Sequence, residues 1–495
     1  MRQAVKTVGD VAVHRIPCAL VALESCIDAH KAKPWKGDLP VSQVPARDGA
    51  FGRFRAALGD SPPLIWAFVY FFCLLSGYYV LRPVREAMAA SSDIEAVFPP
   101  AMVGFFLDRG VALNEFTLQV IFTLVFVIML VLQPVYGWLV SRFPRRVFLP
   151  VIYLFFIATL LLFYLMFDSG IAGRGLAFIL WITVFNLFAV AVFWSFMADV
   201  FNNVEARKYY GYIGAAGTVG AFVGPALTKG LVERVGIPNM MLVSAALFSI
   251  CVLCILKLRK WAVLREAERK QVSGEIPMGG SVLAGLKLIV REPLLRWLAL
   301  MVVLGVGVGT LLYNEQNAIA RTLFSTSEAR ADYFATLDLA VNSLTLVVQL
   351  LLTRTLLSRY GIAPALLIPG CAIILGFSIL AASPLPLMIA IVQVVTRASE
   401  FSLAKPARET IYTRVGREWR YKAGAAIDTV IYRGGDLVFV WVHKLLSAFG
   451  SNVVFGVGLL VASGMTFGAW RLLREASKLP AERSAEVRAA GQETS

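Results

Sequence analysis

Charged residues are scarce in this chain of 495 residues: Asp, Glu, Lys and Arg make up 16% of it, while 58% of the residues are hydrophobic. Soluble domains average about 25% charged and about 45–50% apolar residues. The shortage of charge excludes an ordinary water-soluble protein, because so much apolar surface needs lipid as its solvent. We therefore expect a membrane protein, long enough for roughly a dozen spans of about 20–25 residues.

Histidine and cysteine are equally scarce, with three and six residues. The cysteines form no disulfide framework, because Cys73, Cys251, Cys254 and Cys371 all lie in apolar runs. Cys251 and Cys254 have the spacing of a redox or metal motif, yet inside a span we interpret them as packing residues. No cluster of metal ligands and no nucleophile–base pattern stands out. We expect no metal, no cofactor and no enzymatic activity.

A signal peptide is also lacking, because the polar first 60 residues contain no apolar core followed by a small-residue cleavage site. We interpret residues 1–60 as a cytoplasmic N-terminal tail, largely disordered, and residues 473–495 as a second cytoplasmic tail. The net charge of +15 would suit nucleic acid as a partner. In a membrane protein it is typical of basic cytoplasmic loops beside anionic lipid, so we expect a lipid bilayer and no nucleic acid as partner.

Long apolar runs recur at regular spacing and predict the fold class. We expect an all-α membrane protein with about twelve transmembrane helices, many of them apolar nearly all round. A charged stretch, the cytoplasmic linker 259–292, divides them into an N-terminal six-helix lobe, 61–258, and a C-terminal six-helix lobe, 293–472. The predicted spans are 63–88, 113–140, 147–168, 175–200, 208–232, 238–258, 293–320, 333–357, 362–382, 384–411, 423–449 and 452–472.

The loops between these spans differ in their content of Lys and Arg. The basic loops are 141–146, 201–208, 257–292 and 414–422, whereas the alternate loops 169–174 and 383–384 are poor in basic residues. Because basic loops stay on the cytoplasmic side, we expect both termini in the cytoplasm of a multi-pass protein of the cell (inner) membrane.

A faint internal repeat relates the two halves. Leu139–Pro144 matches Leu356–Gly361 at the same place in each half, between its second and third spans. Parallel halves of six helices are the arrangement of the major facilitator superfamily. Residues 137–146 also resemble that superfamily's loop signature, which implies a gating latch. The alternative is that the basic residues only anchor the loop on the cytoplasmic side. The predicted gating residues are Gly137, Arg142, Arg145 and Arg146.

Charged residues interrupt the end of the first span, at Arg82, Arg85 and Glu86. Each charge at membrane depth costs about 2.5–3.5 kcal/mol on insertion scales, unless it faces a cavity or a partner. The arginines either extend to the membrane interface or face a central water-filled route for an anion, and we favour the second interpretation. Pro83 predicts a break in the helix here, which would free backbone groups toward a polar surrounding.

A denser cluster of charges lies in the tenth and eleventh spans, from Arg397 to Asp436. It either pairs internally to hold helices together or binds an anionic substrate, since arginine offers a bidentate fork to phosphate or carboxylate. Gly434 and Gly435 follow Arg433 and would let a ligand approach the backbone. The predicted substrate-binding residues are Arg82, Arg85, Lys405, Arg408, Lys422, Asp428 and Arg433.

Carboxylates in the seventh and eighth spans are candidates for proton coupling, namely Glu315 and Asp338. His443 lies near the end of a span, so the sequence does not favour a proton relay through histidine. The fifth span carries glycines from Gly211 to Gly224 at intervals of three or four residues, which predicts close helix packing. No Gly-Lys-Ser/Thr follows them and no strand precedes them, which excludes a P-loop ATPase.

Three short segments resemble the ATP/ADP translocase (nucleotide transporter) family, which is similar in fold to the major facilitators. They are Tyr79–Glu86, Phe193–Phe196, and Tyr421–Asp428 followed by Arg433 and two glycines. The resemblance implies nucleotide exchange, with Arg85 and Arg433 on the phosphates. It also implies supporting roles for Lys422 and Asp428.

We therefore expect a secondary active transporter that moves an anionic, phosphorylated metabolite by alternating access, with ATP and ADP exchange as the leading case. A proton-coupled permease for an organic anion or drug is the second hypothesis, in which Glu315 or Asp338 would titrate. A non-transporting membrane scaffold is the third. We expect the chain to act as a monomer.

Overall fold

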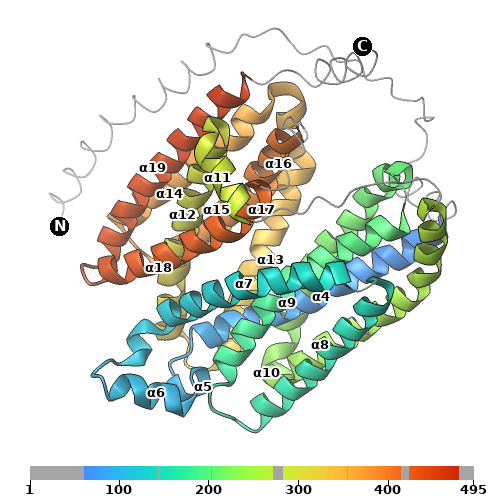
Figure 1. Ribbon diagram of the computed structural model, residues 1–495. Helices are drawn as coiled ribbons and strands as arrows, with labels where there is room; N and C mark the ends of the chain where they lie inside the picture. The colour runs from blue at the N-terminus through green and yellow to red at the C-terminus, as the bar shows by residue number, and fades with distance from the viewer. Residues whose placement is uncertain are drawn as a thin grey trace. The chain divides into compact units, whose positions relative to one another are not determined.

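The computed structural model describes residues 61–142, 145–201, 203–270, 282–353, 355–413 and 423–478, and these are almost entirely helical (Figure 1). The helices are α4 (Pro62–Ala89), α5 (Ile94–Val97), α6 (Pro100–Leu107), α7 (Thr117–Arg142), α8 (Arg145–Asp168), α9 (Arg174–Val200), α10 (Asn203–Lys270), α11 (Val282–Arg291), α12 (Pro293–Leu323), α13 (Ser327–Val348), α14 (Ile362–Ala382), α15 (Pro386–Ser399), α16 (Lys405–Thr413), α17 (Gly424–Ala426), α18 (Tyr432–Ser447) and α19 (Ser451–Ala476). A 3₁₀ turn, η1, spans Leu113–Phe116. Four segments are π-helical: η2 (Gln349–Thr353), η3 (Leu356–Tyr360), η4 (Glu400–Ala404) and η6 (Ile427–Ile431).

The twelve predicted spans are confirmed by the helices in the described part of the chain. Ten segments there are long and apolar enough to cross a membrane. One of them, Lys208–Leu264, contains a non-helical residue, Gly236, and holds two spans. A further span is formed by α17, η6 and α18 together, which the π-helical turn divides into shorter pieces.

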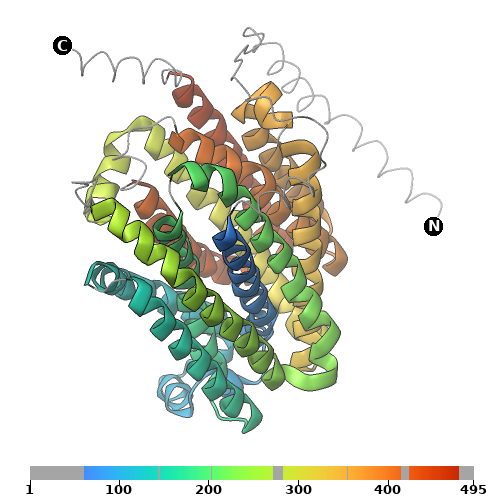
Figure 2. The same ribbon diagram turned by 90° about the vertical axis from the view of Figure 1, so that its right-hand side faces the viewer.

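The chain reverses direction within α10, at Gly236. Its φ of 79° is favourable only for glycine. Before the reversal, Thr228 Oγ1 donates a hydrogen bond to the Val80 carbonyl of α4. After it, Ser244 Oγ and Cys251 Sγ donate to the carbonyls of Gly77 and Tyr70, so this half runs antiparallel to α4. Both halves therefore pack against α4, the blue helix in Figure 2.

Glycines make the close contact between α4 and the first half of α10. A Cβ atom on Gly220 would lie 2.5 Å from the Phe72 carbonyl oxygen, and one on Gly224 would lie 2.5 Å from Tyr79 Cβ. The predicted close packing of this glycine-rich helix is confirmed, and its neighbour is the helix that carries Arg82.

The structure differs from the sequence prediction at Pro83, where the predicted break is wrong. The helix α4 continues through Pro83 to Ala89. A proline inside a helix loses one backbone hydrogen bond, and the packing of α4 against both halves of α10 compensates for that loss. Two charged stretches outside the predicted spans are also helical: α10 extends to Lys270, and α11 occupies part of the predicted linker.

Buried apolar side chains form two main cores. The first joins α4, α7, α8, α9 and α10, and the second joins α11, α12, α14 to α17 and α19. We call α4 to α10 the N-terminal lobe and α11 to α19 the C-terminal lobe. Within the C-terminal lobe, α13 contacts α15, and it also packs against α4 and α10 of the N-terminal lobe. The exact domain boundaries stay predictions.

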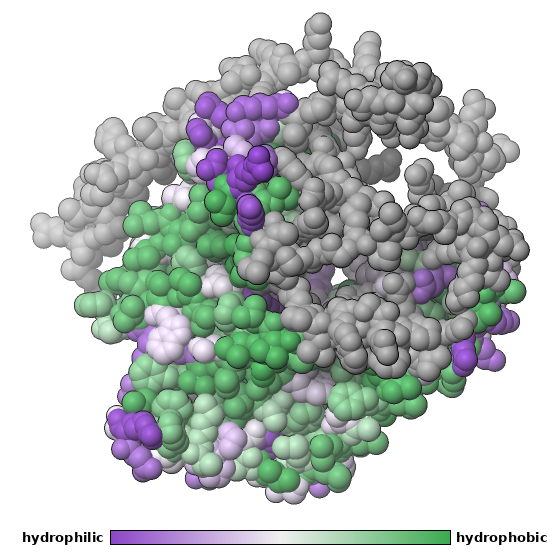
Figure 3. All heavy atoms as spheres, viewed as in Figure 1, coloured by the Kyte–Doolittle hydropathy of each residue, from purple (hydrophilic) through white to green (hydrophobic). Residues whose placement is uncertain are grey.

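The surfaces of the spans are apolar, as lipid contact requires. Large side chains such as Leu350, Leu445 and Leu460 are exposed. On the face seen in Figure 3, apolar residues cover most of the described surface. A water-soluble protein rarely exposes so large an apolar area, so these helices have the surface expected of membrane-spanning helices.

Candidate functional site

Polar contacts join the two lobes near the ends of α4 and α12 and the start of α13. We call this the outer side, following the orientation predicted from the basic loops. Lys229 Nζ of α10 lies 3.1 Å from Asp332 Oδ2 and 2.7 Å from Thr336 Oγ1 of α13. Asn342 Nδ2 donates to the Ala221 carbonyl oxygen at 2.5 Å. The outer halves of the lobes are therefore closed against each other.

A second set of outer contacts joins α7 and its preceding turn to α18. Gln119 Nε2 donates to the Val440 carbonyl oxygen at 3.2 Å, and Lys444 Nζ lies 3.5 Å from Glu115 Oε2. Figure 1 shows α7 and α18 approaching each other across the lobes. The closure on the outer side therefore involves α10 with α13 and α7 with α18, in addition to the packing of α13 against α4.

Glu86 is the first charged group inside this closure. Its carboxylate is paired with Arg85, lies 3.9 Å from Arg82 Nε, and accepts a hydrogen bond of 2.5 Å from the Tyr313 hydroxyl of α12. The residue is only 5% exposed. A buried carboxylate is stable only when it is paired, and Glu86 has partners from both lobes.

Asp338 of α13 is the second buried carboxylate. Its Oδ1 atom lies 3.3 Å from Arg82 Nη1 of α4 and 2.9 Å from Arg397 Nη1 of α15. The Asp338 side chain is 4% exposed and the two arginine side chains are 16% and 17% exposed. One carboxylate oxygen therefore joins two arginines that belong to different lobes.

Arg433 of α18 is held by Asp436, at 3.2 Å between Nη1 and Oδ2, and Asp436 also accepts from Thr310 Oγ1 at 3.0 Å. Arg85 lies within electrostatic reach of Asp436 across the lobes. The expected approach of a ligand does not hold at Gly435 and stays a prediction at Gly434, where a Cβ atom would meet only Phe126, at 3.9 Å. Gly435 is buried against α12, where a Cβ atom would lie 3.2 Å from Val306 Cγ1, so it serves helix packing.

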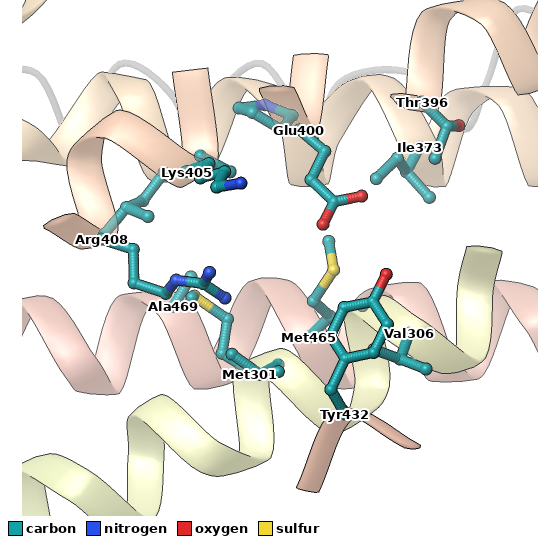
Figure 4. A pocket seen from close by; sticks show the side chains of 15 residues that line it. Met301, Val306, Ile373, Thr396, Glu400, Lys405, Arg408, Tyr432, Met465 and Ala469 are labelled. Atoms are coloured by element: carbon teal, nitrogen blue, oxygen red, sulfur yellow. The ribbon is translucent and has the colours of Figure 1, made fainter. Parts of the chain in front are cut away.

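Lys405 and Arg408 line a pocket inside the C-terminal lobe (Figure 4). Their cationic groups, the Glu400 carboxylate and the Tyr432 hydroxyl face the same space. The cavity of about 70 Å³ has room for only a few water molecules. The pocket adjoins the groups described above, because Glu400 is within electrostatic reach of both Arg397 and Asp436. Asp428, which is half exposed, lies 3.5 Å from Arg408 Nη2.

These groups form one charged network, which we call the central network. It contains four arginines and three carboxylates, so one positive charge is in excess; the pocket adds Lys405, Arg408 and Glu400. Contacts between the lobes are made by Glu86 with Tyr313 and by Arg82 with Asp338, and the pair of Arg433 and Asp436 lies on α18 of the C-terminal lobe. The seven residues are Arg82, Arg85, Arg397, Arg433, Glu86, Asp338 and Asp436. Of the three carboxylates, Glu86 and Asp338 are buried, and a buried carboxylate that loses its partners is strongly destabilising.

The structure thus brings Arg82, Arg85, Arg433, Lys405 and Arg408 into one network, with Asp428 at its edge. Lys422 lies outside the described residues, and so do the side chains of the predicted gating residues Gly137, Arg142, Arg145 and Arg146. Among the residues that are described, no three His, Cys, Asp or Glu side chains gather to hold a metal ion.

Of the two coupling candidates, Asp338 lies in the central network and Glu315 lies outside it. Glu315 Oε1 is 2.8 Å from His443 Nε2, and Glu315 Oε2 accepts from Ser451 Oγ at 2.7 Å. All three residues belong to the C-terminal lobe. The sequence did not favour a role for His443, because nothing local indicated that it would be buried beside a carboxylate.

Sequence reasoning also missed Tyr313 and Thr310. Neither carries a charge, and their partners lie far away in the chain: 227 residues separate Tyr313 from Glu86. The only local signal is the polar stretch that begins at Thr310 inside an otherwise apolar span.

Comparisons with known proteins agree with this architecture. The model of the Major Facilitator Superfamily matches residues 87–439. The ADP,ATP carrier protein 1 of Chlamydia muridarum (strain MoPn / Nigg) is 23% identical over 503 residues, covering 87% of this chain and 91% of that protein. The resemblance to nucleotide translocases noted from short motifs is thus confirmed as a distant similarity along most of the chain.

Solved structures show the same fold. An autoinhibited peptide transporter of the POT family has a TM-score of 0.55 at 14% identity, covering 85% of this chain and 98% of that one. The human organic anion transporter MFSD10 has a TM-score of 0.53 at 13% identity, covering 82% and 98%. With ten segments in the described part of the chain long and apolar enough to cross a membrane, and with the family match over most of its length, this chain belongs to the Major Facilitator Superfamily and is a multi-pass membrane transporter.

Proposed function

We propose that the chain is a secondary active transporter that exchanges phosphorylated anions, with ATP and ADP as the leading pair. The observation that carries this proposal is the meeting of partly buried arginines from both lobes in the central network. Arginine binds phosphate oxygens in a bidentate manner, and several arginines at low exposure suit a ligand with several negative charges. The distant similarity to a bacterial ADP,ATP carrier supports a nucleotide over other phosphorylated metabolites.

The placement of these groups supports a mechanism of alternating access. Arg82 and Arg85 lie on α4, whereas Arg397 and Arg433 lie on α15 and α18. A substrate bound between them would contact both lobes, and the lobes would rock around it. The outer contacts, such as Lys229 with Asp332, would open as the opposite side closes. We place both termini in the cytoplasm and assign a latch role to the loop of Gly137 and Arg142, with the chain acting as a monomer.

A proton-coupled permease is the second candidate, and one contact favours it. Glu315 Oε1 and His443 Nε2 form a buried hydrogen-bonded pair at 2.8 Å, and a carboxylate and an imidazole side by side are groups that could carry a proton. In that case a proton gradient, rather than a counter-transported nucleotide, would supply the driving force, and the pair would carry the proton.

Transport in proteoliposomes separates the two candidates. Vesicles loaded with unlabelled ADP should take up labelled ATP, whereas empty vesicles should not. Uptake into empty vesicles that depends on a pH gradient, and is lost in Glu315→Gln, would instead identify the permease. If Arg85→Ala and Arg433→Ala retained full exchange, the central network would not be the binding site.

A further inference from the structure

We propose that Asp338 is an internal competitor of the substrate: its carboxylate occupies the anion site between Arg82 and Arg397, and only a multiply charged anion displaces it. This inference rests on the proposed function and adds a determinant of specificity to the same site.

The first argument is the position of the carboxylate. Asp338 Oδ1 faces guanidinium groups from both lobes, at 3.3 Å from Arg82 Nη1 and 2.9 Å from Arg397 Nη1. A phosphate held by the same two arginines would place an oxygen where Oδ1 now lies. The aspartate therefore takes the place that the proposed function assigns to the substrate.

The second argument is that the pairing is incomplete. Asp338 Oδ2 and Arg397 Nη2 are buried and have no hydrogen-bond partner among the described residues. An unmade hydrogen bond in a buried place is costly, so this arrangement is less favourable than a fully paired one. A phosphate group has three free oxygens and could pair with both arms of a guanidinium fork.

The third argument is the contrast with Glu86, the neighbouring carboxylate. Glu86 has Arg85, Arg82 and the Tyr313 hydroxyl as partners, and neither of its oxygens is left unpaired in the described structure. Glu86 is therefore a fixed counter-ion, whereas Asp338 is held less completely and is the one that can exchange.

Charge makes the competition selective. A phosphate monoester carries about −1.5 to −2 near neutral pH, more than the single charge of the aspartate. A monoanion such as acetate gains no such advantage over a tethered carboxylate. Displacing Asp338 also breaks its contact with Arg82, which is one of the links between the lobes. A multiply charged anion bound between Arg82 and Arg397 would take over this link between the lobes, whereas a monoanion would leave Asp338 in place.

The test measures the affinity of the full chain, purified in detergent, for pyrophosphate and for acetate. Asp338→Asn should bind pyrophosphate about tenfold more tightly than the wild type, which is about 1.4 kcal/mol. The same variant should acquire measurable acetate binding. Asp338→Glu, which restores the charge, should return both affinities toward wild-type values.

Asp332→Asn is the matched control, because Asp332 lies on the same helix and also pairs with the N-terminal lobe, through Lys229. If Asp338→Asn binds more tightly only because the lobes are loosened, Asp332→Asn would do the same. We expect its affinity for pyrophosphate to stay within about twofold of the wild type, since a partly exposed pair contributes little.

Three results would overturn the inference. Weaker or unchanged pyrophosphate binding in Asp338→Asn would make the aspartate a structural partner that orients the arginines. Misfolding of both Asp338→Asn and Asp338→Ser would lead to the same conclusion. Equal tightening in Asp332→Asn would assign the effect to loosened lobes. The proposed function fails separately, if neither the wild type nor Asp338→Asn binds pyrophosphate or ADP.

Discussion

Replacing Tyr313 by phenylalanine removes one hydroxyl group and leaves the ring in place. That hydroxyl donates a 2.5 Å hydrogen bond to the Glu86 carboxylate across the lobes. A bond of this kind exists only while the outer halves are together. The substitution should therefore favour the state in which the outer side is open.

The size of the effect follows from the surroundings of Glu86. Hydrogen bonds to charged groups contribute about 1.5–3 kcal/mol. Glu86 keeps Arg85 and Arg82 as partners in the variant, so its charge does not become unpaired and the lower end of that range applies. About 1.5 kcal/mol corresponds to roughly a tenfold shift of the equilibrium toward the outward-open state.

Distances between spin labels report this shift directly. Labels at Leu107 and Leu323 lie on exposed positions of the two lobes at the outer side. Two distances are expected between the labels, a shorter one in the closed state and a longer one in the outward-open state. In Tyr313→Phe the population with the longer distance should grow about tenfold relative to the other. Tyr333→Phe is the control, because its hydroxyl accepts from Gln316 within the C-terminal lobe. An unchanged distance distribution in Tyr313→Phe, or an equal change in the control, would refute the reasoning.

Three further predictions concern other parts of the molecule. Gly220→Ala should lower the unfolding temperature, because its Cβ would lie 2.5 Å from a backbone oxygen of α4 and overpacking costs about 1–3 kcal/mol; Gly214→Ala, with open space around it, should not. Arg433→Ala should weaken ADP binding in a thermal-shift titration by about tenfold, since one charged hydrogen-bonding group is lost; unchanged binding would remove Arg433 from the site. Lys229→Met should change the unfolding free energy by less than about 1 kcal/mol, and its effect should disappear at high salt, because the pair is partly exposed.

The spans could be predicted from the sequence because each one is an apolar run of membrane length. The turn at Gly236 could also be placed, since the predicted fifth and sixth spans end and begin on either side of it. The continuity of α4 through Pro83 could not, because it depends on packing against a helix more than a hundred residues later in the chain.

The sequence could predict which arginines belong to the candidate site, but it could not predict the carboxylate with which each arginine pairs. Arginines inside apolar runs indicate a cavity or a partner wherever they occur. Which carboxylate each arginine meets depends on how the lobes come together. The pairing of Arg82 with Asp338 joins the first and eighth spans, and no local pattern in either span indicates the other.

The π-helical segment η4, between α15 and α16, has a consequence for the charges on either side of it. In a regular α-helix Arg397 and Arg408 are eleven positions apart, close to three full turns, and would face the same direction. A π-helical turn accommodates one extra residue, which rotates everything beyond it by about 100° around the axis. Arg397 can thus point toward Asp338 of α13, while Arg408 points in a different direction, toward Asp428 of η6. One π-helical turn therefore makes two arginines of the same span face different carboxylates.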